Sequence, residues 1–374
     1  MNKIGLLTFS YGSNFGGTLQ CLATYKILKN VLNKEVDILN YFPENSYTLS
    51  SLYLAGLKNN GKIDLNKVII KLKYVKKGID KFEDFRKKEL KMTEYLSEEK
   101  IILKAKEYTD LIVGSDQVWN VTGGMRGAYF FEGLENTNKI SYAACSGSDF
   151  YKDIDRERLK NSINDFNYIS VRNNHTHSFV KRLTNKDAEI VCDPSILYDY
   201  KEYLTQEKPK EKYILTYILG SEINGGHEQV LKNIKEKFGN FKVIAVGIAY
   251  AGSGSLQFYP WADKVLYDAS PEDWLNLINN AEFIYTDSYH GVLFSMKFHK
   301  NFLAYYSEKA RASRFIDLAE RYEVGDWIIN TVDDLKSKNS LEKKIDYTKV
   351  DKLLDEHREY SMNFLKKALG ENNE

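Results

Sequence analysis

The sequence predicts an α/β protein with two Rossmann-like lobes and a helical insertion in the N-terminal lobe. Three observations predict this fold class. The chain has 374 residues, which exceeds the ~250–300 residues at which single cores stop growing. Short apolar runs alternate with segments of helical apolar spacing in both halves. Most of these runs end in polar or glycine residues, as strands do at the functional edge of a doubly wound sheet.

The first elements form a βαβ unit. Residues 3–9 form an apolar run typical of a buried parallel strand, residues 18–32 have helical spacing, and a second strand is predicted at 35–39. The turn GSNFGG precedes the helix. Backbone N–H groups at a helix start favour anions, so we predict substrate contacts there. A tight turn that needs only the conformational freedom of glycine is the alternative. The predicted substrate-binding residues of this turn are Asn14, Gly16 and Gly17.

Residues from about 46 to 107 interrupt this rhythm and predict the helical insertion. Seven lysines lie between Lys58 and Lys77, and Asp64 is the only acidic residue among them. A solvated helix face is the simpler interpretation. Contact with lipid phosphates at the inner face of the membrane is the alternative, because a basic amphipathic stretch suits anionic lipid.

Further strands are predicted at 110–113, 140–144, 168–171 and 190–191. The first of them runs into GSDQVWN. We predict Asp116 as a base on the acceptor side, Gln117 as a substrate contact and Trp119 as a ring that stacks on a sugar. A turn cap for Asp116 and core packing for Trp119 are the alternatives. Arg172 follows the strand at 168–171, where its guanidinium suits a carboxylate or phosphate, with a structural salt bridge as the alternative.

A charged stretch around Pro209 marks the predicted domain boundary. We assign residues 1–205 to the N-terminal lobe, on the acceptor side, and residues 206–340 to the C-terminal lobe. Residues 341–374 are predicted as a helix that crosses back to the N-terminal lobe, by analogy with two-lobed sugar enzymes. In the second lobe, strands are predicted at 213–219, 241–246 and 283–286, and helices at 229–238, 271–281 and 292–298.

The strand at 283–286 leads into DSYHG, which places His290 near the start of a helix. A histidine that changes charge near pH 7 suits proton transfer. A structural histidine is the alternative. Other candidate substrate contacts in this lobe are Ser288 and Gly291 in the same turn and the cations Lys309, Arg311 and Arg314, for which a solvated helix face is the alternative.

Bulk properties exclude several function classes. The formal net charge is +1, so no global field attracts the protein to nucleic acid. Neither a signal-peptide core nor a membrane-spanning run is predicted, so we expect a cytoplasmic protein. Three distant cysteines form neither a metal-ligand spacing nor a disulfide framework, and we expect them to be buried. No metal and no cofactor are expected.

Six sequence blocks are spread over most of the first 315 residues: GLLTFSYGSNFGGTLQ, DLIVGSDQVWN, SYAACSGSD, ISVRNN, VCDPSIL and TDSYHGVLFSMKF. Together, and in this order, they resemble the polysaccharide pyruvyl transferase family. In the family the arginine of the fourth block is usually followed by glutamate, whereas Asn173 follows Arg172 here. The resemblance implies a glycosyltransferase-B-like fold, with Arg172, His290 and Lys309 as active-site residues.

The family resemblance also implies a reaction. Phosphoenolpyruvate is the implied co-substrate, bound on the C-terminal lobe, and its enolpyruvyl group becomes a ketal on two hydroxyls of a sugar. The implied acceptor is a cell-surface polysaccharide or its lipid-linked precursor. Two alternatives stay open: a glycosyltransferase of the same fold that uses nucleotide sugars, and a glycan-binding protein without catalytic activity.

Overall fold

The computed structural model describes residues 3–41, 57–59, 62–147, 155–248 and 257–371. Part of the predicted insertion, residues 46–56 and 60–61, lies outside these ranges. The chain divides into two compact units. The first comprises Met1–Glu44, Lys87–Asp199 and Lys352–Glu374, and the second comprises Asn45–Arg86 and Tyr200–Asp351. Residues 45–86, which the sequence analysis assigned to the N-terminal lobe, are therefore grouped with the second unit.

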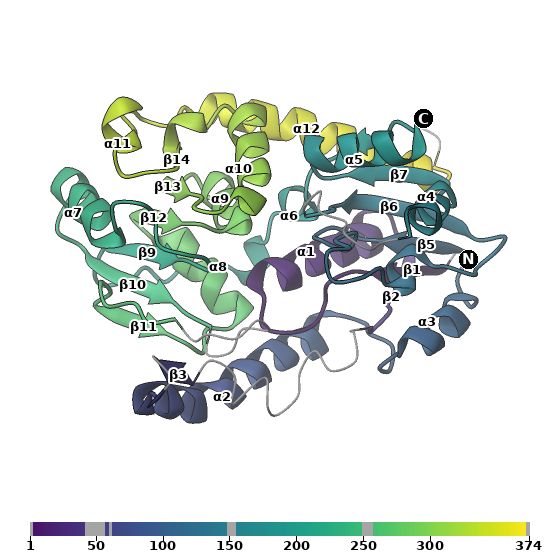
Figure 1. Ribbon diagram of the computed structural model, residues 1–374, viewed down its shortest axis with the longest axis horizontal. Helices are drawn as coiled ribbons and strands as arrows, with labels where there is room; N and C mark the ends of the chain where they lie inside the picture. The colour runs from purple at the N-terminus through teal and green to yellow at the C-terminus, as the bar shows by residue number, and fades with distance from the viewer. Residues whose placement is uncertain (1–2, 42–56, 60–61, 148–154, 249–256, 372–374) are drawn as a thin grey trace. The chain divides into compact units, whose positions relative to one another are not determined.

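The first unit contains a six-stranded parallel sheet in the order β2-β1-β5-β6-β7-β8. Figure 1 shows these strands and the helices that connect them. The predicted strands are confirmed, with small shifts at their ends. The strands are β1 (Lys3–Leu7), β2 (Glu35–Ile38), β5 (Asp110–Val113), β6 (Asn138–Ala144), β7 (Tyr168–Val171) and β8 (Glu189–Ile190).

The helices of this unit are α1 (Phe15–Lys26), α3 (Glu98–Ala105), α4 (Arg156–Asn164), α5 (Asn174–Thr184), the short α6 (Pro194–Leu197) and the part of α12 (Tyr347–Ala368) that follows residue 351. A π-helical turn at Ile27–Val31 continues α1. The core of the unit includes the buried Cys145 and Cys192, and Cys21 is buried within α1. The predicted burial of all three cysteines is confirmed.

The second unit repeats this plan with a parallel sheet in the order β11-β10-β9-β12-β13-β14. Its strands are β9 (Tyr213–Tyr217), β10 (Lys242–Val246), β11 (Lys264–Leu266), β12 (Phe283–Thr286), β13 (Asn301–Tyr305) and β14 (Ile328–Ile329). Its helices include α7 (His227–Phe238), α8 (Pro271–Asn280), α9 (Tyr289–Lys297), α10 (Lys309–Arg321) and α11 (Asp334–Ser337). Ser270 and Asp273 form a capping box at the start of α8.

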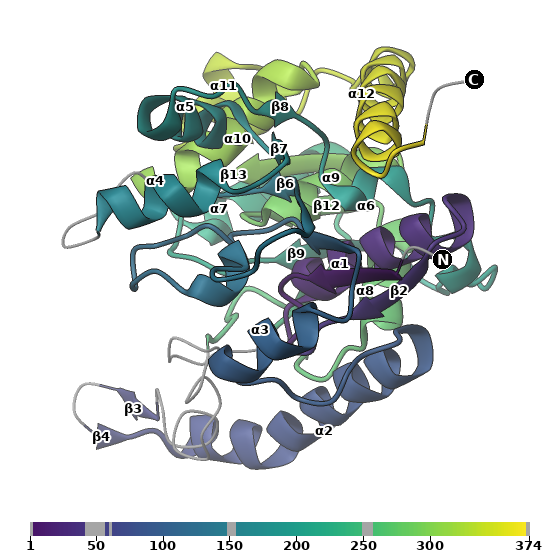
Figure 2. The same cartoon turned by 90° about the vertical axis from the view of Figure 1, so that its right-hand side faces the viewer.

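The described part of the insertion is mainly helical. A short antiparallel pair, β3 (Lys58–Asn59) and β4 (Lys62–Ile63), leads into α2 (Leu65–Glu89). Figure 2 shows α2 along its length, with the two strands at its N-terminal end. No helix in the described part of the chain combines the length and the apolarity needed to cross a membrane.

Strand order fixes where a ligand site belongs in each unit. In the first sheet β1 lies between β2 and β5, and in the second β9 lies between β10 and β12. The direction of winding reverses at these places, so helices cover both faces and loops diverge at the carboxyl ends of the strands. The edges after β1 and β5, and after β9 and β12, are therefore the expected site positions.

Candidate active site

Arg172 is the centre of a buried cluster of charges in the first unit. Its Nη1 atom donates to Oδ2 of Asp193 over 2.9 Å, and its Nη2 atom lies 3.5 Å from Oδ1 of Asp116. The three residues follow β7, β8 and β5, respectively, so the ion pairs join the carboxyl ends of three strands. The Arg172 side chain has no exposed surface. The two ion pairs hold the Arg172 side chain in place within its own unit.

Sequence analysis missed two members of this cluster. Asp193 is fully buried, and besides Arg172 it accepts hydrogen bonds from Oγ of Ser115 at 3.0 Å and from the backbone N–H of Ser195 at 2.9 Å. Both Asp193 and Ser115 directly follow strands or their extensions, which is the signal that could have identified them. Their long-range partners follow from the sheet order, which the sequence does not contain.

Asp116 has an unusual backbone. Its φ is 72°, in the left-handed region that few residues other than glycine adopt. Its carbonyl accepts the N–H groups of Val118 and Cys145, and its Oδ1 accepts the N–H of Gln117 at 2.9 Å. The carboxylate is thus fixed at the edge of the sheet, beside Arg172. The side chain of Gln117 accepts a hydrogen bond from Nδ2 of Asn120 at 2.8 Å.

Trp119 is a core residue. Its side chain is 0% exposed, and its ring stacks with Phe130 and meets Phe166 edge-on. Its indole N–H donates to the carbonyl of Tyr129 at 3.4 Å. This burial disagrees with the predicted stacking on a sugar, because the ring has no face left for a ligand. The core-packing alternative describes the residue instead.

The glycine-rich turn is fixed by side chains on both sides. Oδ1 of Asn14 accepts the N–H of Gly17 at 3.0 Å and caps α1. Gln20 donates from the next turn to Oγ1 of Thr8 and to the carbonyl of Gly17, each at 2.9 Å. Gly16 and Gly17 are buried in the first turn of α1. The turn therefore presents a helix start at the carboxyl end of β1.

Asn173 replaces the glutamate usual after this arginine, and the structure gives it a different function. Its Oδ1 accepts the N–H of Thr176 at 2.9 Å, which caps α5. Its Nδ2 lies 3.6 Å from Sγ of Cys145. The residue is 1% exposed. A capping amide thus replaces an acid whose charge would be buried here.

Asp287 joins the two central strands of the second unit. Its Oδ1 accepts the N–H of Leu219 at 2.7 Å and its Oδ2 accepts the N–H of Gly220 at 2.6 Å. Because Leu219 and Gly220 follow β9 and Asp287 follows β12, the carboxylate bridges the place where the winding reverses. Asp287 is 2% exposed. Sequence analysis quoted this residue as part of a motif without assigning it a function.

The residues around His290 form a compact turn. Oγ of Ser288 accepts the N–H of Gly291 at 3.2 Å and caps α9, and Oγ1 of Thr286 accepts the N–H of Ser288 at 3.0 Å. A Cβ atom at Gly291 would lie 2.5 Å from Oγ1 of Thr286, so only glycine fits this approach. His290 lies in the first turn of α9 and is 7% exposed. The turn thus places an imidazole at a helix start on the carboxyl edge of β12.

The predicted cationic cluster begins α10. This helix follows β13, the strand beside β12, so α9 and α10 both start at the same edge of the sheet. The side chains of Lys309 and Arg311 lie outside the described part of the structure. Arg314 is half-buried. Farther along α10, Arg321 forms an ion pair with the buried Asp317 at 2.9 Å.

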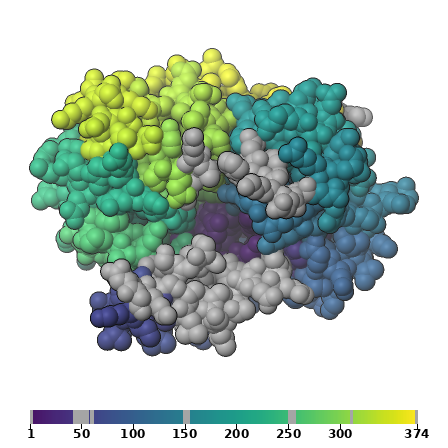
Figure 3. Space-filling view, in the orientation of Figure 1, coloured from purple at the N-terminus to yellow at the C-terminus, as the bar shows by residue number. Residues whose placement is uncertain are grey.

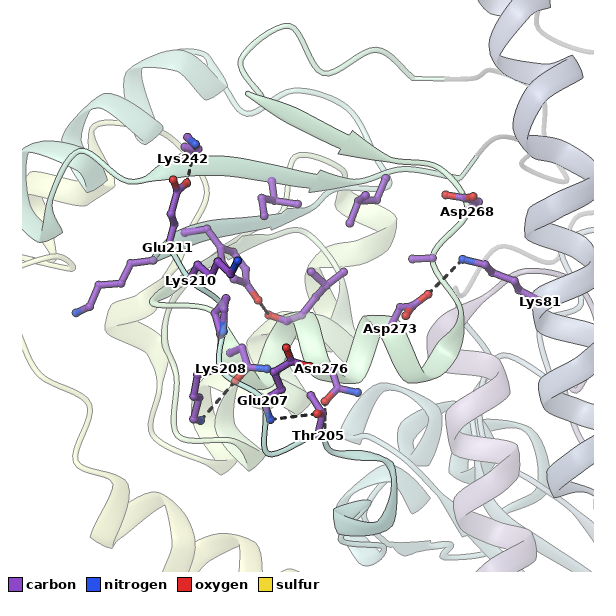
Figure 4. A pocket seen from close by; sticks show the side chains of 18 residues that line it. Lys81, Thr205, Glu207, Lys208, Lys210, Glu211, Lys242, Asp268, Asp273 and Asn276 are labelled. Atoms are coloured by element: carbon purple, nitrogen blue, oxygen red, sulfur yellow. Dashed lines mark hydrogen bonds and ion pairs between the residues drawn. The ribbon is translucent and has the colours of Figure 1, made fainter.

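A cavity of 740 Å³ lies in the second unit, away from these residues (Figure 4). It is lined by the starts of β9 and β10, by residues that follow β11 and by α8, whereas His290 follows the end of β12. Several of its charges pair with one another: Lys242 with Glu211 at 2.6 Å and Lys81 with Asp273 at 3.4 Å. This cavity therefore belongs to a different part of the fold from the candidate site.

Comparisons with known proteins address both the family and the fold. The model of a family described as polysaccharide pyruvyl transferase matches residues 14–308, which is most of the chain. A search of curated proteins found no match.

Solved structures show the fold at low sequence identity. A candidate UDP-N-acetylglucosamine 2-epimerase from Listeria monocytogenes has a TM-score of 0.55 at 11% identity, covering 99% of this chain and 97% of that chain. S. aureus MnaA with UDP has a TM-score of 0.54 at 13% identity, covering 100% and 98%. An Arabidopsis thaliana protein in complex with UDP-L-rhamnose has a TM-score of 0.53 at 12% identity, covering 99% and 98%. The predicted glycosyltransferase-B-like fold of two parallel-sheet lobes is confirmed.

Proposed function

Because the chain belongs to the polysaccharide pyruvyl transferase family, we propose that it moves the enolpyruvyl group of phosphoenolpyruvate onto a sugar, where it forms a pyruvate ketal. The family is one of transferases that act on saccharides. The acceptor we propose is a sugar of a cell-surface polysaccharide or of its lipid-linked precursor. The observation that carries the proposal is the turn from Thr286 to Gly291, which holds His290 at a helix start beside the start of α10.

The proposed reaction has two steps, addition of one sugar hydroxyl and closure of the ketal by a second. The methylene carbon of phosphoenolpyruvate gains a proton and becomes a methyl group, and a sugar hydroxyl oxygen bonds to the adjacent carbon as its proton leaves. The bond between that carbon and the phosphate oxygen then breaks. A second sugar hydroxyl closes the ketal, and its proton leaves with the phosphate. One donor and one diol thus give one ketal and one inorganic phosphate.

His290 is the proposed proton donor or phosphate contact. Its place in the first turn of α9 suits both roles, because N–H groups at a helix start attract an anion and a bound anion favours protonated imidazole. A positioned proton donor contributes about 10²–10⁴ in rate. Lys309, Arg311 and Arg314 would add positive charge for the phosphate and carboxylate of the donor, as their position at the start of α10 allows.

Asp116 and Arg172 are proposed to act on the acceptor side of the reaction. Asp116 remains our candidate for the base that accepts a proton from the sugar hydroxyl. The ion pairs of Arg172 with Asp116 and Asp193 support a positioning role, since they fix the carboxylate of Asp116. The proposed acceptor contacts lie at the same carboxyl edge of the first sheet; they are Asn14, Gly16, Gly17 and Gln117.

The test is direct transfer of label. Purified protein is incubated with phosphoenolpyruvate that carries ¹³C in the pyruvyl carbons and with polysaccharide extracted from cells that lack the gene. Mass spectrometry of the hydrolysed polymer should show the labelled ketal, with release of one phosphate per ketal. The His290→Gln variant should show neither, and His177→Gln, a change at a partly exposed histidine of α5, should behave as wild type.

Two outcomes would overturn the proposal. Transfer from a panel of nucleotide sugars, with none from phosphoenolpyruvate, would identify a glycosyltransferase. Binding of the polysaccharide without any transfer, and unchanged in His290→Gln, would identify a glycan-binding protein.

A further inference from the structure

In the first two turns of helix α2, lysine side chains are buried and apolar side chains are exposed. Lys67 and Lys71 point inward and are 9% and 2% exposed, whereas Leu65, Ile69 and Leu72 are 73%, 60% and 69% exposed. A surface helix in water normally shows its charges and buries its leucines. The outer face of α2 is therefore poorly suited to water.

Packing on the second unit fixes this orientation. Val75 of α2 is buried against Ala245, Tyr259 and Tyr267, and Nζ of Lys67 lies 5.6 Å from the ring centre of Phe258. Burial, and then the charge of Lys67, lowers the pKa of Lys71. Because Val75 and Lys71 hold the inner face, the exposed residues cannot turn inward by rotation of the helix.

The exposed apolar residues form one continuous patch. Leu65, Ile69 and Leu72 are spaced by four and three residues, so they lie on one face of the helix. Ile63 in β4, two residues before Leu65, is 62% exposed. Figure 3 shows the surface of this region, the dark-blue atoms at the lower left. Scattered apolar residues are ordinary on a protein surface, whereas a contiguous patch marks a contact with something apolar.

Positive charge borders this patch. Lys62, Lys73 and Lys77 are exposed around it, and the outward-facing acids of α2 begin only at Asp80. Asp64, the one acid near the patch, accepts the N–H groups of Asn66 and Lys67 at the start of the helix. An apolar face with a cationic rim is complementary to a bilayer, where side chains enter the acyl region and lysines reach lipid phosphates.

We propose that the outer face of α2, formed by Ile63, Leu65, Ile69 and Leu72 with its rim of Lys62, Lys73 and Lys77, docks the protein on a membrane of anionic lipid. The helix lies along the surface and does not span the bilayer. This contact would bring the enzyme to an acceptor carried on lipid. Membrane docking does not depend on the transfer reaction, because transfer to a water-soluble acceptor can be measured separately.

Flotation with vesicles tests the proposal. The full-length protein should float with vesicles of phosphatidylcholine mixed with phosphatidylglycerol and less with phosphatidylcholine alone, and added salt should weaken the binding. Changing Lys62, Lys73 and Lys77 to Gln should weaken binding about 100-fold, at about fivefold per lysine. Changing Leu65, Ile69 and Leu72 to Ser should weaken it by more than about tenfold.

Matched variants separate docking from general effects. Leu103→Ser removes a leucine that is 66% exposed on α3, and Lys232→Gln with Lys352→Gln removes two exposed lysines elsewhere; all should float as wild type. Circular dichroism checks the fold of each variant. The proposal would be overturned if the wild type did not float, or if the variant with Leu65, Ile69 and Leu72 changed to Ser floated equally well. If sedimentation showed a wild-type dimer that this triple variant cannot form, the face would instead belong to a contact with a second copy of the chain.

Discussion

The Nη1 atom of Arg172 lies 2.9 Å from Oδ2 of Asp193, and neither side chain is exposed to solvent. Breaking one partner of a buried pair leaves an uncompensated charge. We expect Asp193→Ala to lower the free energy of unfolding by about 3–5 kcal/mol. Denaturant unfolding measures this change. Glu356→Gln, which breaks an exposed pair with Lys352, is the control and should cost less than about 1 kcal/mol. If Asp193→Ala lowered the free energy of unfolding as little as Glu356→Gln does, the buried pair would not stabilise the fold.

Trp119 should behave as a core residue. Truncation to Ala should lower the free energy of unfolding by about 3–5 kcal/mol, because it leaves a cavity between Phe130 and Phe166. Trp119→Phe keeps most of the volume and should retain the wild-type KM for the sugar acceptor. A large rise of that KM in a stably folded Trp119→Phe protein would restore the predicted stacking on a sugar.

Gly291 should tolerate no side chain. Alanine there would place Cβ 2.5 Å from Oγ1 of Thr286, so the turn must move. We expect a loss of about 1–3 kcal/mol in stability, by overpacking, together with a fall in kcat. Gly123→Ala is the matched control, because a Cβ at that position meets nothing within 4 Å. A Gly291→Ala protein with wild-type stability and activity would contradict this account of the turn.

His290→Gln distinguishes the two roles proposed for the imidazole. Loss of a proton donor should lower kcat by about 10²–10⁴-fold and remove one limb of the pH–rate profile. Loss of a phosphate contact should instead raise the KM for phosphoenolpyruvate and leave the profile in place. Steady-state kinetics between pH 5 and 9 measure both, with His177→Gln as control. Wild-type kinetics in His290→Gln would remove the residue from the site.

His227 should make the second unit sensitive to acid. Burial lowers its pKa from 6.5 to about 4, against a smaller opposing effect of Glu222, and its Nδ1 lies 2.9 Å from the hydroxyl of Tyr285. The unfolded chain therefore binds this proton more readily than the folded one. The stabilisation is complete above pH 6.5 and is lost as the pH falls toward 4, by up to about 3 kcal/mol.

The same residue provides the test. In His227→Phe the free energy of unfolding should vary less with pH between about 4 and 6.5 than in the wild type. An unchanged slope in His227→Phe would show that another group causes the loss of stability in acid.

The sequence predicted the local elements well and the long-range partners poorly. The strands Asp110–Val113, Tyr168–Val171 and Phe283–Thr286 were predicted with their observed bounds, because buried parallel strands are continuous apolar runs. The pairing of Arg172 with Asp193 depends on the adjacency of β7 and β8, which periodicity does not encode. Trp119 follows a strand like a ligand-binding residue, yet Phe130 and Phe166 enclose it.

The division of the chain also has a consequence for synthesis on the ribosome. The first unit is assembled from three separate stretches, the last of which is Lys352–Glu374. Within that stretch Oγ of Ser361 accepts the N–H of Cys192, and the carbonyl of Ala368 accepts from Asn138. These bonds form only after the final helix has left the exit tunnel. The N-terminal sheet is therefore translated before the helix that supplies these acceptors, and a chain that stops at residue 351 would lose the acceptor of the Cys192 N–H and one acceptor of the Asn138 side chain.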